Sequence, residues 1–214
     1  MNNLESFSAL GIAEEFLSAL AEKGFKEPTG IQSLAIPLLL SGEKDIIGQA
    51  LTGTGKTAAF GLPILQVLER SENPGALILS PTRELSIQIA AELESLKGSK
   101  NLRIATFYGG QAIQIQLGLL KRGVDIAVGT PGRIMDLHRR GVLKLDNLQF
   151  AVLDEADEML DMGFIDDIRE SIINEIVAPP LTSGSVPPSP RNDHAINFPT
   201  TVKPVLPLKV SVIT

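Results

Sequence analysis

A glycine-rich segment that ends in lysine and threonine has the residue types needed to bind a triphosphate. It reads Ala50-Leu51-Thr52-Gly53-Thr54-Gly55-Lys56-Thr57 and lies between a strand-like stretch and a helical one. In such a loop the glycines let backbone N–H groups approach phosphate oxygens, and the helix that follows adds the positive end of its dipole. The lysine reaches the β- and γ-phosphates, while the threonine hydroxyl binds Mg²⁺. The segment therefore predicts an NTP·Mg²⁺ site, although Ala50 stands where the strict pattern has glycine.

A cluster of four carboxylates is the second group of residues that could do chemistry. Asp154, Glu155, Asp157 and Glu158 directly follow the apolar, strand-like stretch 150–153. Asp154 at the strand end could help to hold Mg²⁺ through water, and Glu155 could orient or deprotonate an attacking water. An acidic turn that caps a helix would have the same composition. A bound cation would relieve the repulsion among the four carboxylates. The glycine-rich segment 50–57, here called the phosphate loop, would bring such a cation to the site together with a bound triphosphate.

Two other interpretations of the glycine-rich segment remain open. A plain strand-to-helix turn would leave Lys56 solvated. The pattern Gly53-x-Gly55-x-x-Ala58 also matches the fingerprint of NAD-type dinucleotide-binding folds. Those folds need an acidic residue at the end of the next strand to hold the ribose, whereas that strand ends here as Leu79-Ser80-Pro81.

Apolar stretches of strand length alternate with helical ones up to residue 176. We expect strands over 45–50, 76–80, 103–107, 125–128 and 150–153, and helices over 12–24, 31–40, from the glycine-rich loop to about 70, 84–96, 111–121 and 165–176. Parallel strands need crossover helices, which cover both faces of the sheet. The predicted fold class is therefore α/β, with three layers and a mainly parallel sheet. Both candidate groups follow strands, so they should share the rim where such sheets bind ligands.

The composition limits the classes of protein that need to be considered. The chain has 214 residues, 43% of them apolar, which suffices for one main domain. It has no cysteine and no run approaching the ~20 apolar residues of a membrane helix, so we expect a cytoplasmic protein that does not enter membranes. The formal net charge of −6 argues against a bulk positive field that grips nucleic acid. Any nucleic-acid site must therefore be local.

Together the phosphate loop and the Asp154-Glu155-Ala156-Asp157 tetrad resemble those of the DEAD-box RNA helicases of superfamily 2. Further motifs of that family occur in the same order. These are the adenine-reading Q motif at 24–32 with the upstream aromatic Phe7, followed by Pro81-Thr82-Arg83-Glu84-Leu85, Gly109-Gly110, Thr130-Pro131-Gly132-Arg133 and Met159-Leu160-Asp161-Met162-Gly163-Phe164. The resemblance covers residues 1 to about 176. It implies a RecA-like P-loop NTPase domain that binds ATP, Mg²⁺ and RNA.

The resemblance also implies roles for particular residues. The Gln32 amide could pair with the N6 donor and N7 acceptor of adenine, so ATP should be preferred over GTP, and Phe25 could stack on the base. Core packing is the alternative role for Phe25. The residues implied to bind single-stranded or duplex RNA, independently of sequence, are Pro81, Thr82, Arg83, Gly109, Gly110, Thr130, Pro131, Gly132 and Arg133. Each of the two arginines could instead be a surface ion-pair partner.

The sequence after residue 176 departs from the family pattern. Eight of the fourteen prolines lie in the last 36 residues, so we expect 1–176 to form the ATP-binding domain and 177–214 an extended or disordered tail. The alternating residues 209–214 could add an edge strand, and 211–214 weakly resemble the family's Ser-Ala-Thr strand. The second RecA-like domain, with its arginine finger, is expected to be missing. We therefore expect a monomer without turnover of its own, either a helicase fragment or a non-catalytic binder of RNA or a protein partner.

Overall fold

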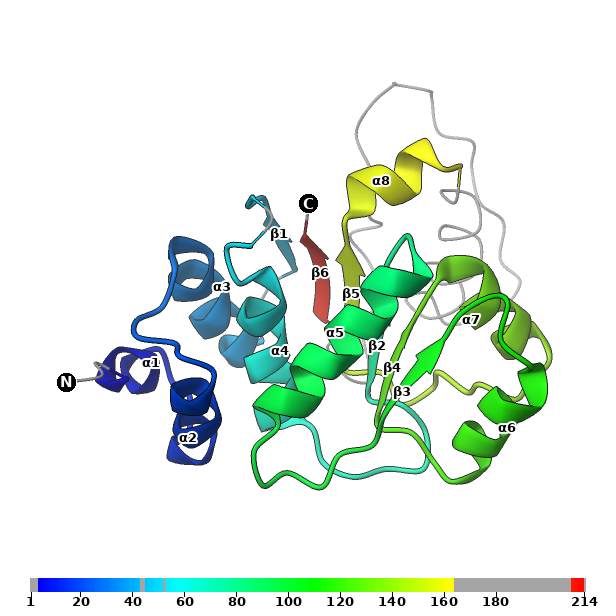
Figure 1. The fold of residues 1–214 in the computed structure, drawn as a ribbon, viewed down its shortest axis with the longest axis horizontal. Helices are drawn as coiled ribbons and strands as arrows, with labels where there is room; N and C mark the ends of the chain where they lie inside the picture. The colour runs from blue at the N-terminus through cyan, green and yellow to red at the C-terminus, as the bar shows by residue number, and fades with distance from the viewer. Residues whose placement is uncertain (1–3, 43–44, 52, 164–208, 214) are drawn as a thin grey trace, which may run out of the picture.

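The structure is a computed structural model that describes residues 4–42, 45–51, 53–163 and 209–213 (Figure 1). Helices and strands alternate along most of this length. The helices are α1 Glu5–Ala9, α2 Glu14–Glu22, α3 Gly30–Ser41, α4 Lys56–Val67, α5 Arg83–Leu96, α6 Ile113–Lys121, α7 Pro131–Arg139 and α8 Ala156–Asp161. The strands are β1 Ile46–Gly48, β2 Ala76–Leu79, β3 Ile104–Phe107, β4 Ile126–Gly129, β5 Phe150–Asp154 and β6 Lys209–Ile213.

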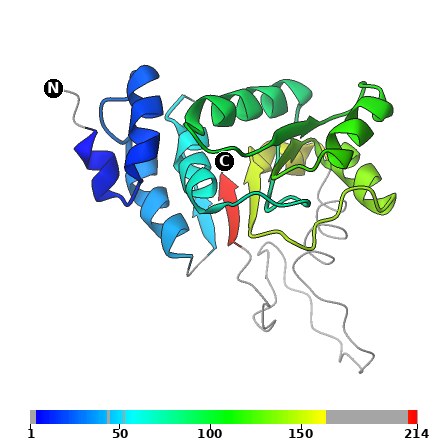
Figure 2. The same ribbon diagram turned by 90° about the horizontal axis from the view of Figure 1, so that it is seen from below.

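The six strands form one sheet in the order β1-β6-β5-β2-β4-β3, and every neighbouring pair is parallel. The crossovers through α4 and α5 run toward β3, and those through α6 and α7 run back toward β5. Right-handed crossovers that run in opposite directions fall on opposite faces of a sheet. Helices accordingly lie on both sides of the strands in the view of Figure 2. The predicted α/β class with a parallel sheet is confirmed.

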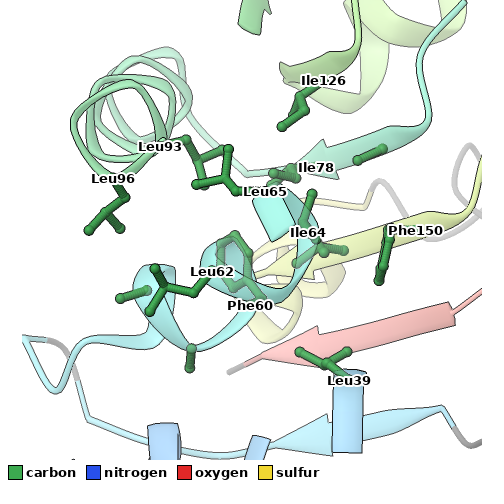
Figure 3. Close-up of a cluster of buried hydrophobic side chains, with 14 of the residues drawn as sticks. Leu39, Phe60, Leu62, Ile64, Leu65, Ile78, Leu93, Leu96, Ile126 and Phe150 are labelled. Atoms are coloured by element: carbon green, nitrogen blue, oxygen red, sulfur yellow. The ribbon is translucent and has the colours of Figure 1, made fainter. Parts of the chain in front are cut away.

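Two apolar cores, one on each face, hold the sheet between its helices. Successive strand residues point to opposite faces, so Ile78 joins the core that contains α4 and α5, whereas Leu77 and Leu79 join the core that contains α7 and α8. Figure 3 shows part of the first core, in which Phe60 and Leu65 of α4 lie among side chains from the sheet and the neighbouring helices. Residues 58–65 of α4 are buried all around, as expected for a helix packed between other elements. This burial fixes the helix that begins at the phosphate loop.

An ion pair joins the amino-terminal ends of β3 and β4, at the rim opposite the candidate site. The Asp125 carboxylate is 1% exposed and accepts hydrogen bonds from the Arg103 guanidinium and from the backbone N–H groups of Arg103 and Ser71. Burial would raise the pKa of Asp125, but these hydrogen bonds and the Arg103 charge outweigh it and lower that pKa. The ion pair therefore holds β3 and β4 together at the rim far from the site.

Several elements differ from their predicted form. The strand expected over 45–50 is limited to Ile46–Gly48, and the patterns did not predict α1, α7 or α8. The helix expected over 165–176 lies outside the described residues, as does the 177–208 part of the expected tail. In the described part of the chain, none of the helices has the length and hydrophobicity of a membrane-spanning segment.

The strand near the C-terminus is a correction. We expected residues 209–214 at most at the edge of the sheet, within an otherwise extended or disordered tail. In the structure β6 is an interior strand that pairs Val212 with Ile47 of β1 on one side and with Leu153 of β5 on the other. The prediction failed because strand order is not sequence order: β1 and β5 are not adjacent, and a parallel strand fills the gap between them.

Candidate nucleotide site

The phosphate loop joins the end of β1 to the start of α4. Its glycines Gly53 and Gly55 have φ values of 78° and 81°, in the left-handed region that residues with a Cβ rarely adopt. Gly55 is the N-cap of α4, and the Thr54 hydroxyl donates a 2.7 Å hydrogen bond to the Leu51 carbonyl. Lys56 and Thr57 form the first turn of the helix. Of the predicted loop residues, Thr52 lies outside the described part of the chain.

The phosphate loop and the acidic segment, residues 154–158, line the same cavity of about 580 Å³. It is lined by Gln49, Ala50, Leu51, Lys56, Glu155, Asp157 and Glu158. The two groups come from β1 and β5, which are separated only by β6 in the sheet. The three carboxylates of the lining would repel a negatively charged ligand bound to Lys56. A cation bound beside that ligand would reduce this repulsion.

Asp154 is the last residue of β5 and is only 3% exposed. Burial raises the pKa of its carboxyl group, while the positive charge of Lys56 and a hydrogen bond from the Glu155 backbone N–H lower it. Its Oδ1 atom is buried and accepts no hydrogen bond within the described residues. An unpaired buried carboxylate oxygen is costly and fits a site for a metal ion or its water.

The donor set near Asp154 suits Mg²⁺ better than a metal held wholly by protein. Among the described residues, no group of three or more His, Cys, Asp or Glu side chains could hold a metal ion. Mg²⁺ usually keeps several waters and takes one or two carboxylates together with substrate phosphates. The Asp154 carboxylate and the Thr57 hydroxyl would be enough protein ligands for such an ion.

Glu155 adopts a strained backbone at the start of α8. Its φ of 54° and ψ of 50° place it in the left-handed region, where no other non-glycine among the described residues lies. Such a conformation costs about 1–3 kcal/mol and is often found at functional sites. Burial, a hydrogen bond with Glu158 and the charges of Asp154 and Glu158 raise the pKa of Glu155, and Lys56 opposes them. A raised pKa suits a residue that accepts a proton from water.

The Q-motif segment contacts the phosphate loop directly, which sequence reasoning missed. Gln32 is fully buried; its Oε1 accepts the Thr29 N–H at 3.0 Å and its Nε2 donates to the Gly55 carbonyl at 3.1 Å. The Thr29 hydroxyl donates to the Thr54 carbonyl at 2.8 Å. A Cβ atom at Gly55 would overlap the Gln32 amide. The Thr-x-x-Gln capping box at the start of α3 was the signal that could have located Gln32.

Phe25, the predicted adenine-stacking residue, is half-buried near the start of α3. Its ring meets that of Phe7 edge to face, with centroids 6.1 Å apart. Phe7 is fully buried in the core of α1 to α5. Phe25 therefore has a packed edge and a partly exposed surface.

The predicted RNA-binding residues follow three neighbouring strands at the same rim. The 81–83 segment follows β2, Gly109 and Gly110 follow β3, and 130–133 follows β4. Thr82 and Thr130 are the N-caps of α5 and α7, and Gly109, Gly110 and Gly132 are exposed. Arg83 lies over the Tyr108 ring, 5.0 Å from its centroid. Exposed glycines, helix N-termini and an arginine thus line the rim beside the cavity.

Known proteins resemble this chain over most of its length. Residues 29–191 match the family model for DEAD/DEAH box helicases. The chain is 52% identical over 169 residues to a probable ATP-dependent RNA helicase of Methanocaldococcus jannaschii, and 52% identical over 176 residues to the ATP-dependent RNA helicase CshA of Listeria monocytogenes. These matches cover 79% and 82% of this chain, but 46% and 34% of the two relatives.

Solved structures agree with this similarity. A crystal structure of a DEAD box protein from Methanococcus jannaschii matches 98% of this chain with a TM-score of 0.79 and 41% identity. That of a hypothetical ATP-dependent RNA helicase from Sulfolobus tokodaii matches 94% with a TM-score of 0.73 and 33% identity. This chain covers 49% and 50% of those two chains, so it spans about half the length of the solved proteins.

Proposed function

We propose, from the premise that the chain belongs to the DEAD/DEAH box helicase family, that it binds ATP with Mg²⁺ in the cavity and RNA at the adjacent rim. Membership in that family confirms the resemblance drawn from the sequence. The observation that supports the nucleotide site is the buried Oδ1 of Asp154, which has no partner in the described part of the chain and lies close to the charge of Lys56, beside a cavity of about 580 Å³. A metal–triphosphate complex would satisfy both groups at once.

The proposed roles follow from position. Lys56 and the N–H groups of the loop bind phosphate oxygens, and Thr57 and Asp154 hold the metal. Mg²⁺, when bound, would neutralise charge on the phosphates. Glu155 orients or deprotonates the attacking water, because it follows Asp154 directly and its raised pKa favours proton uptake.

The base and the RNA are proposed to bind at opposite sides of the phosphate loop. Phe25 would stack on adenine on the α3 side, and Gln32 would read the base by exchanging the hydrogen bonds that its buried amide makes with Thr29 and Gly55 for bonds with adenine. On the side of β2, β4 and β3, backbone N–H groups, hydroxyls and the arginines Arg83 and Arg133 would bind phosphate and sugar without reading the bases. A local site of this kind is compatible with the net charge of −6.

We propose that this chain alone binds both ligands without efficient turnover. Lys56 is the only cation among the described residues that line the cavity. In related phosphoryl-transfer enzymes an arginine finger contributes about 10³–10⁵ in rate. A second RecA-like domain could supply such an arginine. The second candidate function is a non-catalytic binder of RNA or a protein partner. It is supported by the same observation that the described lining of the cavity contains no cation besides Lys56.

Titration calorimetry with ADP·Mg²⁺ tests the nucleotide site. We expect saturable binding to the wild-type chain that is tighter for ADP than for GDP. Lys56→Ala should weaken it by about 10- to 100-fold, because a charge-assisted hydrogen bond to phosphate is lost. Lys121→Ala, at an exposed position on α6, is the matched control and should bind as the wild type does. Equal binding by Lys56→Ala and the wild type, or no heat for either, would contradict the proposal.

A further inference from the structure

Helix α6 buries a glutamine where an amphipathic helix would normally bury an apolar residue. Gln116 is fully buried, while its apolar neighbours Ile113, Leu117 and Leu120 are only partly so. Burial of an amide is unfavourable unless its polar atoms are hydrogen-bonded. The contacts of Gln116 therefore indicate why it is there.

Every polar group of the Gln116 amide has a partner. Its Oε1 accepts a 3.0 Å hydrogen bond from Nη1 of Arg133, and its Nε2 donates to the Tyr108 carbonyl at 3.0 Å and to Oε1 of Gln111 at 2.9 Å. Arg133 also donates to the Gln111 carbonyl at 3.4 Å. A guanidinium only donates and a carbonyl only accepts, so the amide can be oriented in one way. Gln116 thus connects Arg133 to the end of β3.

The second arginine of the rim meets the same short segment. Arg83 of α5 lies over the ring of Tyr108, the residue whose carbonyl Gln116 binds. The exposed Gly109 and Gly110 follow Tyr108 directly. Both arginines are therefore positioned by the turn after β3, which is tied to α6 through Gln116.

The partners of Arg133 hold it without neutralising it. Within the described residues it is bound by two neutral oxygens, of Gln116 and Gln111, and by no carboxylate. Ordering a free arginine on binding costs side-chain entropy, and a preorganised side chain avoids part of that cost. In a chain with a net charge of −6, RNA affinity would depend on few cations, so the position of each one matters.

We propose that Gln116 is a positioning residue for RNA binding, which fixes the Arg133 guanidinium at the rim with its full charge available to an RNA phosphate. The inference rests on the proposed RNA-binding function. A neutral amide suits this role because it orders the arginine by a hydrogen bond, whereas a carboxylate at the same place would also cancel its charge.

Fluorescence anisotropy with a labelled oligouridylate tests the proposal. Gln116→Leu should bind about 3- to 10-fold more weakly, because Arg133 loses its fixed orientation. Gln116→Glu should keep an oxygen bonded to Arg133 but lose the hydrogen bonds that Nε2 donates to Tyr108 and Gln111. Because its carboxylate also offsets the arginine charge, it should bind RNA more weakly, and the slope of log affinity against log salt should fall in magnitude by about one, as for the loss of one phosphate contact. Gln114→Leu, at an exposed position on the same helix, should bind as the wild type does.

A double-mutant cycle and a nuclear magnetic resonance measurement separate positioning from a merely structural role. In an Arg133→Ala background, Gln116→Leu should weaken RNA binding by less than about twofold, since the two residues act as one unit. The Nε–Hε order parameter of Arg133 should be high in the wild-type chain and in Gln116→Glu, and low in Gln116→Leu. Thermal melts of each variant establish that the folded fraction is equal at the assay temperature.

The outcomes distinguish this inference from the function on which it rests. If the wild-type chain binds no RNA, both the RNA-binding function and this proposal fail. If the wild type binds RNA but Gln116→Leu leaves its affinity or the order of Arg133 unchanged, only the positioning role fails. An equal loss in the wild-type and Arg133→Ala backgrounds would likewise overturn it.

Discussion

Asp154 is held in an environment that opposes its charge. Its side chain is buried, one oxygen has no partner within the described residues, and Lys56 and a single backbone N–H supply the compensation. The raised pKa of Asp154 means that the neutral form is favoured in the folded protein compared with the unfolded chain. The charged Asp154 carboxylate is therefore expected to destabilise the protein when no cation is bound.

Replacement of Asp154 by asparagine should stabilise the free protein. The pKa of Asp154 is higher in the folded protein than in the unfolded chain. The stability that this carboxyl group contributes is therefore fully present below its unfolded pKa of about 3.9 and is lost as the pH rises through its folded pKa. Asp154→Asn removes that loss, so at neutral pH we expect a gain of about 1 kcal/mol, or about 2–4 °C in Tm. Urea unfolding at several pH values would measure it.

The same substitution should abolish the metal contribution to binding. In the wild-type chain, Mg²⁺ should raise the Tm observed with ADP, and Asp154→Asn should lose this increment. Asp161→Asn, at an exposed position at the end of α8 and outside the cavity lining, is the matched control and should keep the increment. A less stable Asp154→Asn, or one that keeps the Mg²⁺ increment, would contradict the proposed site.

At the scale of elements, β6 determines how the two halves of the nucleotide site are spaced. It pairs with β1, which leads into the phosphate loop, and with β5, which ends at Asp154. Removal of an interior strand would leave backbone groups on both neighbours unpaired. The distance between the phosphate loop and Asp154 thus depends on a strand that lies far away in sequence.

Proline substitutions in β6 distinguish an interior strand from an edge strand. Successive N–H groups of a strand point to opposite neighbours, so an edge strand tolerates proline at one of two adjacent positions, whereas an interior strand tolerates it at neither. We expect Ser211→Pro and Val212→Pro each to destabilise the fold by about 1–3 kcal/mol, because each leaves a buried carbonyl unpaired. Ser211→Ala keeps the N–H group and should have a small effect. Thermal unfolding that is unaffected by either proline would show that the strand is not interior.

In the molecule as a whole, the parallel sheet gathers the candidate residues that follow its strands at one rim. β1 and β5 lead into the proposed nucleotide-binding residues, and β2, β4 and β3 lead into the predicted RNA-binding residues on the other side of β5. The opposite rim carries the Arg103–Asp125 pair, which ties β3 to β4 away from any candidate ligand. The candidate ligand-binding residues and this ion pair therefore lie at opposite ends of the strands.

This chain by itself should not turn ATP over efficiently. We expect the rate of this chain to be about 10³-fold or more below that of an enzyme with an arginine finger, and RNA to leave it nearly unchanged. A steady-state ATPase assay with and without RNA measures both. Glu155→Gln is the control that assigns any residual rate to this site. RNA-stimulated turnover that Glu155→Gln abolishes would contradict the expectation and exclude the non-catalytic alternative.

The α/β class and the positions of most strands and helices could be predicted from the sequence, as could the residue types of the phosphate loop and of the acidic segment that are proposed to bind the nucleotide. These features are local: side-chain type, apolar period and position after a strand are all read within a few residues. Three features became visible only in the folded chain: β6 lies between β1 and β5, one oxygen of Asp154 has no partner within the described residues, and Gln32 and Gln116 hold the phosphate loop and Arg133. Those features depend on which distant segments become neighbours, and the free energy that selects neighbours comes from burial over the whole sheet.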